Sequence, residues 1–226
     1  MISTNRTIAG RPNRPRGRRP GSLPHGRAAL LESAIAAFAQ HGFDGANLRG
    51  IAKVAGVDPS LVRIHFGTKA KLWSACVETM AVQTAAVIED VRRLAAATDR
   101  PVDERLRLLI ERSAAFSLTH PKVRDFVARH ASDSEERAKL LTERLVRPAY
   151  EAGLPLIEAG IKEGILRVGH PALFFSLLNT VMNQSSATPT LLHELDPGIA
   201  PAKVHEMLTR SIVATFLHHS CHKRSL

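Results

Sequence analysis

The segment 47–73, NLRGIAKVAGVDPSLVRIHFGTKAKLW, constrains the fold more than any other part of the chain. Asn47 is suited to cap a helix, and Gly56 to end one, because glycine tolerates the left-handed conformation of a helix C-terminus. Asp58 is a second capping residue, and Pro59 follows it in the first turn of the next helix. The segment therefore predicts two short helices joined by a three-residue turn, which is helix-turn-helix spacing.

The second of these helices has two different faces. Val62 and Phe66 are four residues apart and point to the same side, which we expect to be buried. The opposite side carries Pro59, Ser60, Arg63 and Ile64. A helix this short buries little surface by itself, but it fits a major groove about 12 Å wide. Around it stand basic residues suited to phosphate, with Asp58 as the only acid in the segment: Arg49, Lys53, Lys69 and Lys71.

This segment resembles the DNA-binding domain of the TetR family of bacterial transcriptional regulators. The resemblance covers about residues 25–73, including the preceding helix that ends Ala-Gln-His-Gly-Phe. It is carried by Ile51-Ala52, Ala55-Gly56-Val57, His65-Phe66, Lys69 and Leu72. The chain departs from the family pattern in having Leu48 in place of a hydroxyl residue, Leu61 in place of Thr and Arg63 in place of Tyr.

The resemblance implies that the start of the second helix and the third helix contact DNA. The expected DNA-binding residues, with Lys53 added from the basic rim, are Arg49, Lys53, Pro59, Ser60, Leu61, Arg63, Ile64, His65 and Lys69. Arg63 is suited to the O6/N7 edge of guanine, worth about 1–3 kcal/mol of discrimination, and Ile64 to a thymine methyl. Two alternatives stay open: Arg63 as a solvated surface side chain, and His65 as a wedge between helices.

The N-terminus is a separate basic segment. Residues 1–27 hold seven arginines and no acid, so they carry +7 of the net charge of +10. Residues 1–24 are rich in Arg, Pro and Gly, and we expect them to form a disordered arm. We expect Arg16, Arg18 and Arg19 to contact DNA, because the segment resembles the arms of other helix-turn-helix proteins that reach into an adjacent minor groove. The alternative is a solvated tail without a role in binding.

The rest of the chain predicts an all-α fold, because its apolar residues recur at helical spacing and no alternating strand pattern occurs. Prolines at 101, 121, 171 and 201 fall where first helical turns are expected. We expect a helix-turn-helix domain over 25–71 and a larger helical domain over 72–226. The expected helices of the larger part are about 69–97, 102–118, 121–131, 133–166, 171–187 and 201–219.

By resemblance, the larger domain dimerises and binds a small-molecule effector. Two apolar stripes are candidates for the dimer interface, with plain core as the alternative: 173, 174, 177, 178, 181 and 182, and 204, 207, 208, 212 and 216. The effector itself is not identified by the sequence. The candidate polar contacts are His120, Arg129, Tyr150, Asn179 and Asn183.

Other classes of protein lack support in the sequence. No apolar run of about 18 residues occurs, and no secretory signal, so we expect a cytoplasmic protein without a membrane role. The sequence contains no catalytic motif, and we expect no cofactor. We also expect no metal site, because adjacent ligands at a chain end, such as the His218–His222 cluster, rarely close a tetrahedral zinc site alone.

The predicted function is a dimeric repressor released from a palindromic operator by an effector. The alternative is a DNA-binding protein without effector control.

Overall fold

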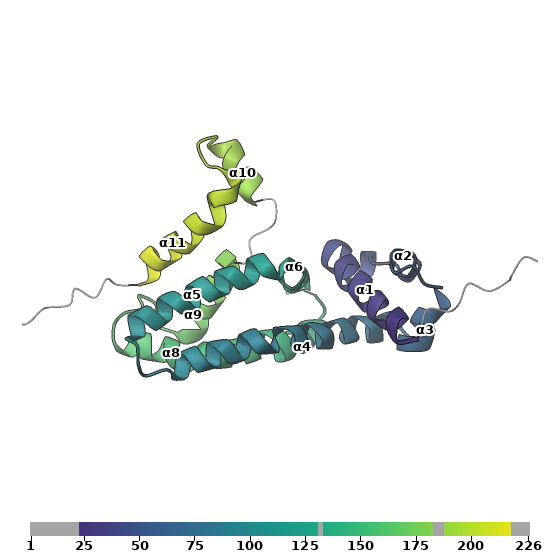
Figure 1. The fold of residues 1–226 in the computed structure, drawn as a ribbon, viewed down its shortest axis with the longest axis horizontal. Coiled ribbons are helices and arrows are strands. Elements are labelled where there is room, and N and C mark those ends of the chain that lie inside the picture. The colour runs from purple at the N-terminus through teal and green to yellow at the C-terminus, as the bar shows by residue number, and fades with distance from the viewer. Residues whose placement is uncertain (1–22, 131–132, 183–187, 218–226) are drawn as a thin grey trace, which may run out of the picture.

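The computed structural model describes residues 23–130, 133–182 and 188–217, and within them the chain is all-α, as predicted (Figure 1). Among these residues the β-structure consists of one isolated antiparallel bridge between Leu166 and Leu217. None of the described helices is both long and apolar enough to cross a membrane. The helices are α1 Leu23–Gly45, α2 Leu48–Val54, α3 Ser60–Phe66, α4 Lys69–Ala96, α5 Val102–Thr119, α6 Pro121–His130, α7 Glu135–Leu141, α8 Arg147–Lys162, α9 Pro171–Met182, α10 Thr188–Leu195 and α11 Val204–Phe216.

Capping residues and a glycine define the ends of these helices, with Asn47 and Gly56 acting as the sequence predicted. The Asn47 side chain accepts a hydrogen bond from the Gly50 N–H (3.0 Å) at the start of α2. Gly56 has φ 67°, a left-handed conformation that a side chain disfavours, and it turns the chain toward α3. The Thr68 hydroxyl accepts from the Lys71 N–H (3.2 Å) at the start of α4. Local sequence therefore determines the helix-turn-helix geometry.

Helix α1 is kinked near its C-terminal end. Gly42 has φ 72° and ψ 180°, so the regular helix stops there, as expected, and one further turn continues to Gly45. The kink brings Phe43 over Phe38, with parallel rings 6.0 Å apart. This final turn therefore adds an aromatic side chain to the edge of the core.

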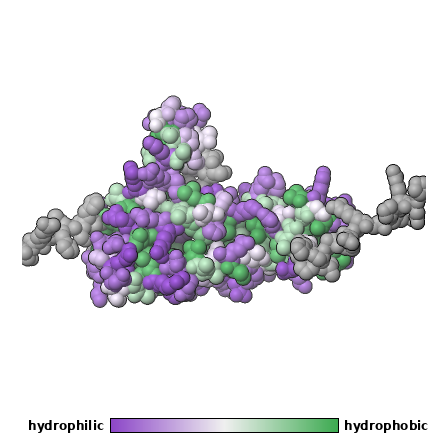
Figure 2. Space-filling view, in the orientation of Figure 1, coloured by the Kyte–Doolittle hydropathy of each residue, from purple (hydrophilic) through white to green (hydrophobic). Residues whose placement is uncertain are grey.

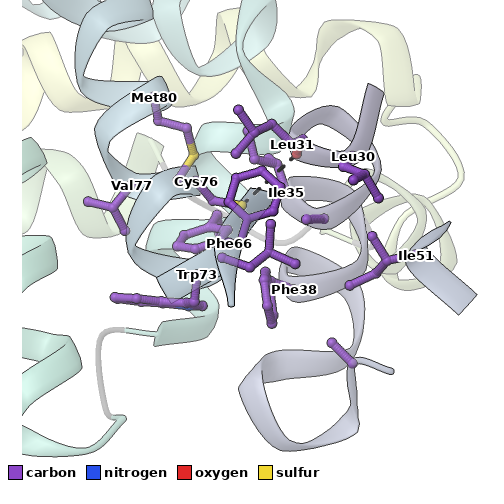
Figure 3. Close-up of a cluster of buried hydrophobic side chains, with 14 of the residues drawn as sticks. Leu30, Leu31, Ile35, Phe38, Ile51, Phe66, Trp73, Cys76, Val77 and Met80 are labelled. Carbon is purple, nitrogen blue, oxygen red and sulfur yellow. Dashed lines mark hydrogen bonds between the residues drawn. The ribbon is translucent and has the colours of Figure 1, made fainter. Parts of the chain in front are cut away.

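A first hydrophobic cluster joins the helix-turn-helix to the beginning of α4 and to α6 (Figure 3). Leu30 and Phe38 of α1, Trp73 of α4 and Phe126 of α6 are almost completely buried in it. Leu72 lies just beyond the domain boundary expected at 71/72 and is also buried in this cluster. The packing of the N-terminal unit is thus continuous across that position, and the boundary remains a prediction.

A second cluster forms the larger end of the molecule. The C-terminal half of α4 lies alongside α5 and α8, with α9 and α11 packed against them (Figure 1). Its centre includes Leu106, Ile110, Leu156, Ile157 and Phe174, each at most 1% exposed. Helix α4 belongs to both clusters and runs along the length of the molecule, so it connects the two ends directly.

The described helices differ from the expected ones in two places, the stretch 133–166 and the helix α10. The stretch 133–166 splits into α7, a π-helical turn over Thr142–Val146 and α8, which begins with Pro148 in its first turn and continues through Pro155. Of the helix expected over 171–187, Pro171–Met182 form α9, and residues 183–187 lie outside the described residues. The sequence analysis missed α10, which has no buried residue and projects from the body (Figure 1).

Candidate nucleic-acid interface and cavity

Helix α3 separates a buried face from an exposed one. Val62 and Phe66 are 2% and 6% exposed and belong to the first cluster. On the other side, Pro59, Ser60 and Arg63 are exposed, and Ile64 is 68% exposed. α3 lies with α2 at one end of the molecule (Figure 1). An arginine and an isoleucine thus stand side by side on an open surface, held there by the packing of the opposite face.

Asp58 fixes the start of α3. Hydrogen bonding from the Ser60 side chain, and then from the Ser60 backbone N–H (2.8 Å to Asp58 Oδ1), holds the pKa of Asp58 below its ordinary value of 3.8. The carboxylate therefore stays charged and caps the helix at neutral pH. The Ser60 hydroxyl is engaged with this carboxylate, so a DNA contact from Ser60 requires that hydroxyl to act as an acceptor as well.

Two predicted DNA-binding residues lie behind the exposed face. Leu61 is half-buried and packs against the first cluster. His65 is also half-buried, its ring lies 6.0 Å from that of Phe66, and its Nε2 atom is enclosed without a hydrogen-bond partner among the described residues. These positions support the packing alternative for His65 and give Leu61 a role in holding α3.

The basic residues around α3 differ in whether their side chains are exposed or already bonded within the protein. Arg49 and Lys53 of α2 and Lys71 of α4 are exposed. Lys69 is half-buried: its ammonium donates to the backbone carbonyl of Asp44 (3.1 Å) and lies 5.0 Å from the centre of the Phe43 ring. Lys69 therefore ties the start of α4 to the end of α1. The arm residues Arg16, Arg18 and Arg19 lie outside the described residues.

A cavity of ≈ 140 Å³ lies between α4, α5, α6, α8 and α9. Its lining is mostly aliphatic, with Phe116 and Phe175 as its aromatic members. The polar side chains that line it are Thr84, Arg112, Ser113, Ser117, Arg124 and Asn179. Two of the helices that line the cavity, α4 and α6, also contact α1.

The predicted ligand contacts agree with this cavity at one position. Asn179 lines it and donates to the Phe175 carbonyl (2.8 Å). His120 stacks on Phe116 at 4.5 Å, and Tyr150 packs on Phe175 at 5.3 Å, so both lie one residue away from the lining. Arg129 lies beside the Gly42 kink instead. Asn183 falls outside the described residues, as does the His218–His222 cluster.

A buried polar chain connects α4, α6 and α7. His130 is 1% exposed, and its Nε2 faces the Trp73 Nε1–H at 3.5 Å. Because indole nitrogen only donates, Nε2 must accept, so the proton is on Nδ1 and is donated to Asp133 (2.8 Å). The hydrogen bond from Arg137 is the main reason that the pKa of Asp133 lies well below 3.8. The Arg137 guanidinium also covers the Phe43 ring at 4.0 Å.

The expected interface stripes divide into inward and outward residues. On α9, Phe174, Leu178 and Met182 are buried, whereas Leu173 is 52% and Leu177 36% exposed. On α11, Val204 and Ile212 are buried and Met207 is 44% exposed. The face seen in Figure 2 shows hydrophobic residues interspersed with hydrophilic ones along the long helices. Each helix thus contributes both to the second cluster and to the surface.

The fold and the α3 surface define an all-α protein of the helix-turn-helix class. Residues 30–76 match the family model described as "Bacterial regulatory proteins, tetR family". The N-terminal part of the chain is therefore similar to the helix-turn-helix domain of the TetR family. TetR-family regulators are not enzymes, in agreement with the sequence prediction.

One sequence relative and two solved structures of similar fold accompany this match. The HTH-type transcriptional regulatory protein RaaS of Mycobacterium tuberculosis is 30% identical over 140 residues, which are 62% of this chain and 59% of RaaS. The crystal structure of HlyIIR, a hemolysin II transcriptional regulator, has a TM-score of 0.65 at 14% identity and covers 88% of this chain and 100% of HlyIIR. FadR from Bacillus subtilis, solved with stearoyl-CoA, has a TM-score of 0.57 at 14% identity, covering 83% and 97%.

Proposed function

We propose that the protein is a DNA-binding transcriptional regulator that reads duplex DNA with the exposed face of α3. The observation that carries this proposal is the pairing of exposed Arg63 and Ile64 on a seven-residue helix whose other face is buried. The Ile64 side chain is 68% exposed although its contact with water is unfavourable. Its shape and apolar character suit contact with a thymine methyl. Arg63 presents two parallel donors to a guanine edge.

Phosphate contacts would come from the rim of this surface. Arg49 and Lys53 on α2 and Lys71 on α4 have exposed side chains flanking α3 in sequence. Such contacts position a protein on the duplex without reading sequence, and they make affinity fall as salt rises. Lys69, already bonded to the Asp44 carbonyl, retains two ammonium protons for a phosphate.

The regulator works as a homodimer in this proposal. Leu173 and Leu177 of α9 and Met207 of α11 are exposed apolar residues on the two helices expected to form the interface. Two-fold pairing through these helices would present two α3 helices to one duplex, so the operator would be palindromic. Replacing Leu177 with Arg should convert the dimer to a monomer in light scattering. Replacing the exposed Leu191 of α10 with Arg is the control; dimers in both variants would contradict this interface.

Effector binding in the cavity would release the DNA. The cavity touches α4, whose first turns support α3, and α6, which packs against α1. A ligand that fits the cavity better in one arrangement of these helices shifts the population toward that arrangement. If the arrangement that the ligand favours no longer fits the operator, the protein leaves the DNA and repression is relieved. This link between cavity and reading helix favours effector control over constitutive binding.

The test begins with selection of duplexes from a random pool by the wild-type protein. Enrichment of one palindrome, followed by a single protected footprint, is the expected result. Diffuse protection without an enriched sequence would instead support the alternative of DNA binding without sequence-specific regulation. The selected duplex then serves for all measurements on variants.

A further inference from the structure

The cavity is an elongated slot with chemically different ends. Residues 84–91 of α4, 109–117 of α5 and 149–157 of α8 bound it, which at 1.5 Å rise per residue gives a length of about 10–12 Å. One end is formed by Val91, Leu109 and the backbone of Gly153. Since α4 and α5 are joined as an antiparallel pair, Thr84 and Ser117 lie together at the other end, beside α6.

Two basic side chains line the cavity, and each is paired with an acid: Arg124 with Asp125 at the polar end, and Arg112 with Asp90, which is next to Val91 at the other end. The described lining residues include two arginines, Arg112 and Arg124, and no aspartate or glutamate. The Arg124 side chain is 13% exposed, whereas that of Arg112 is 40% exposed. Arg112 is also bonded to the Asp90 carbonyl at 3.1 Å. Arg124 is therefore the cation that is enclosed with the cavity.

The hydrogen bonds of Arg124 leave donors for a ligand. Its Nε and Nη2 lie 2.9 and 2.8 Å from Asp125 Oδ1, and its Nη1 donates to the Ser117 carbonyl at 3.4 Å. These contacts use three of the five N–H groups of a guanidinium. They also hold the plane of the guanidinium in place, so a ligand need not order it. An acceptor in the slot meets a fixed, partly desolvated cation.

We propose that the cavity binds an elongated aliphatic monocarboxylate, with the carboxylate on Arg124 and the chain along the apolar end. The two guanidinium N–H groups that Asp125 and Ser117 leave free suit an anionic acceptor, and the acids paired with the two arginines lie outside the described lining. The aliphatic lining selects the chain. This inference rests on the proposed effector function of the cavity and names the ligand class.

The same contact supplies a route to the DNA-binding end. Arg124 is on α6, the helix whose Phe126 is buried in the first cluster and whose His130 meets Trp73. A carboxylate bound to Arg124 therefore contacts α6, a helix that packs against α1. We expect its binding to change the position of α6 relative to α1.

The experiment compares three ligands of equal chain length by titration calorimetry without DNA, below their critical micelle concentrations: decanoate, 1-decanol and decylamine. Wild-type protein should bind one decanoate per chain, about tenfold more tightly than decanol or decylamine. Arg124→Gln should lose about tenfold in decanoate affinity and keep its affinity for decanol within about threefold. Arg129→Gln, an exposed arginine of the same helix outside the lining, is the control and should match wild type.

Equal binding of decanoate and decanol by wild-type protein would overturn the proposal, and so would binding of none of the three ligands. An equal loss of both ligands in Arg124→Gln would also overturn it. If circular dichroism shows that Arg124→Gln does not fold, the proposal is tested instead by the affinities of the wild-type protein for the three ligands and by the same affinities of Arg124→Lys. Operator selection tests the proposed function separately, so DNA binding without decanoate binding rejects only the ligand class.

Discussion

At the scale of residues, the side chains of α3 show what a sequence pattern can and cannot place. Val62 and Phe66 were predicted to be buried and are, because four-residue spacing fixes their common face. Leu61 and His65 lie between the two faces, and their half-burial depends on packing against α1 and Phe66. The exposed positions therefore follow from helical geometry, whereas the boundary positions need the tertiary structure.

Asp133 allows a test of the buried polar chain. Replacing it with Asn should lower the free energy of unfolding by about 1–3 kcal/mol at about pH 7, because Arg137 and buried His130 lose a charged acceptor. The pKa of Asp133 is lowered by folding from 3.8, so its stabilisation is present above that value and is lost as the pH falls below it.

The measurement is urea unfolding of the wild-type protein and the Asp133→Asn variant at about pH 7 and about pH 3. The difference between them should shrink at the lower pH. Asp99→Asn, at an exposed carboxylate that lies 3.9 Å from Arg100, is the control and should change little. A difference between wild type and Asp133→Asn that is the same at both pH values would contradict this account.

At the scale of elements, alanine substitutions at two glycines of α8 should have opposite effects on the stability of the protein. A Cβ at Gly153 would meet its nearest neighbours at 3.7–3.8 Å, so alanine fits and should stabilise the helix by about 0.5–1 kcal/mol. A Cβ at Gly160 would lie 2.5 Å from Leu106 Cδ1, in a buried position, so alanine should destabilise by about 1–3 kcal/mol. Thermal unfolding compares them; destabilisation by both variants would contradict the packing described here.

Element boundaries were predicted best where a cap defines them. Asn47, Gly56 and Thr68 mark their helix ends by local hydrogen bonds or backbone conformation, so the sequence contains the information. The π-helical turn before α8 is not marked by a cap residue in this way. Helix α10 has no buried residue, and the apolar spacing used to predict the other helices therefore gave no signal for it.

The cavity residues were the hardest to predict. Arg124 lines the cavity and Arg129 does not, although both are arginines of α6. Their difference depends on how α6 is rotated against α5, and long-range packing sets that rotation. Asn179, on α9, whose polar positions are few, does line the cavity, and its contact with a ligand stays a prediction. A sequence without the structure gives the helices of such a pocket but not its lining.

At the scale of the whole molecule, the N-terminal unit depends on the rest of the chain for its core. Trp73 and Met80 of α4 and Phe126 of α6 are buried with α1 and α3. A fragment of residues 23–71 should therefore lack cooperative unfolding and show little dispersion in its amide NMR spectrum. The full chain should unfold cooperatively under the same conditions. A folded 23–71 fragment would show that the α4 and α6 contacts are dispensable.

The central claim is that the exposed face of α3 reads base pairs, and the affinity of variants for the selected duplex tests it most directly. Ser60→Ala combined with Arg63→Ala should weaken binding about tenfold or more, because the base-edge contact of Arg63 is lost. Arg92→Ala, at an exposed arginine of α4 away from α3, should bind like wild type. Unchanged affinity and sequence preference in the folded double variant would contradict the claim.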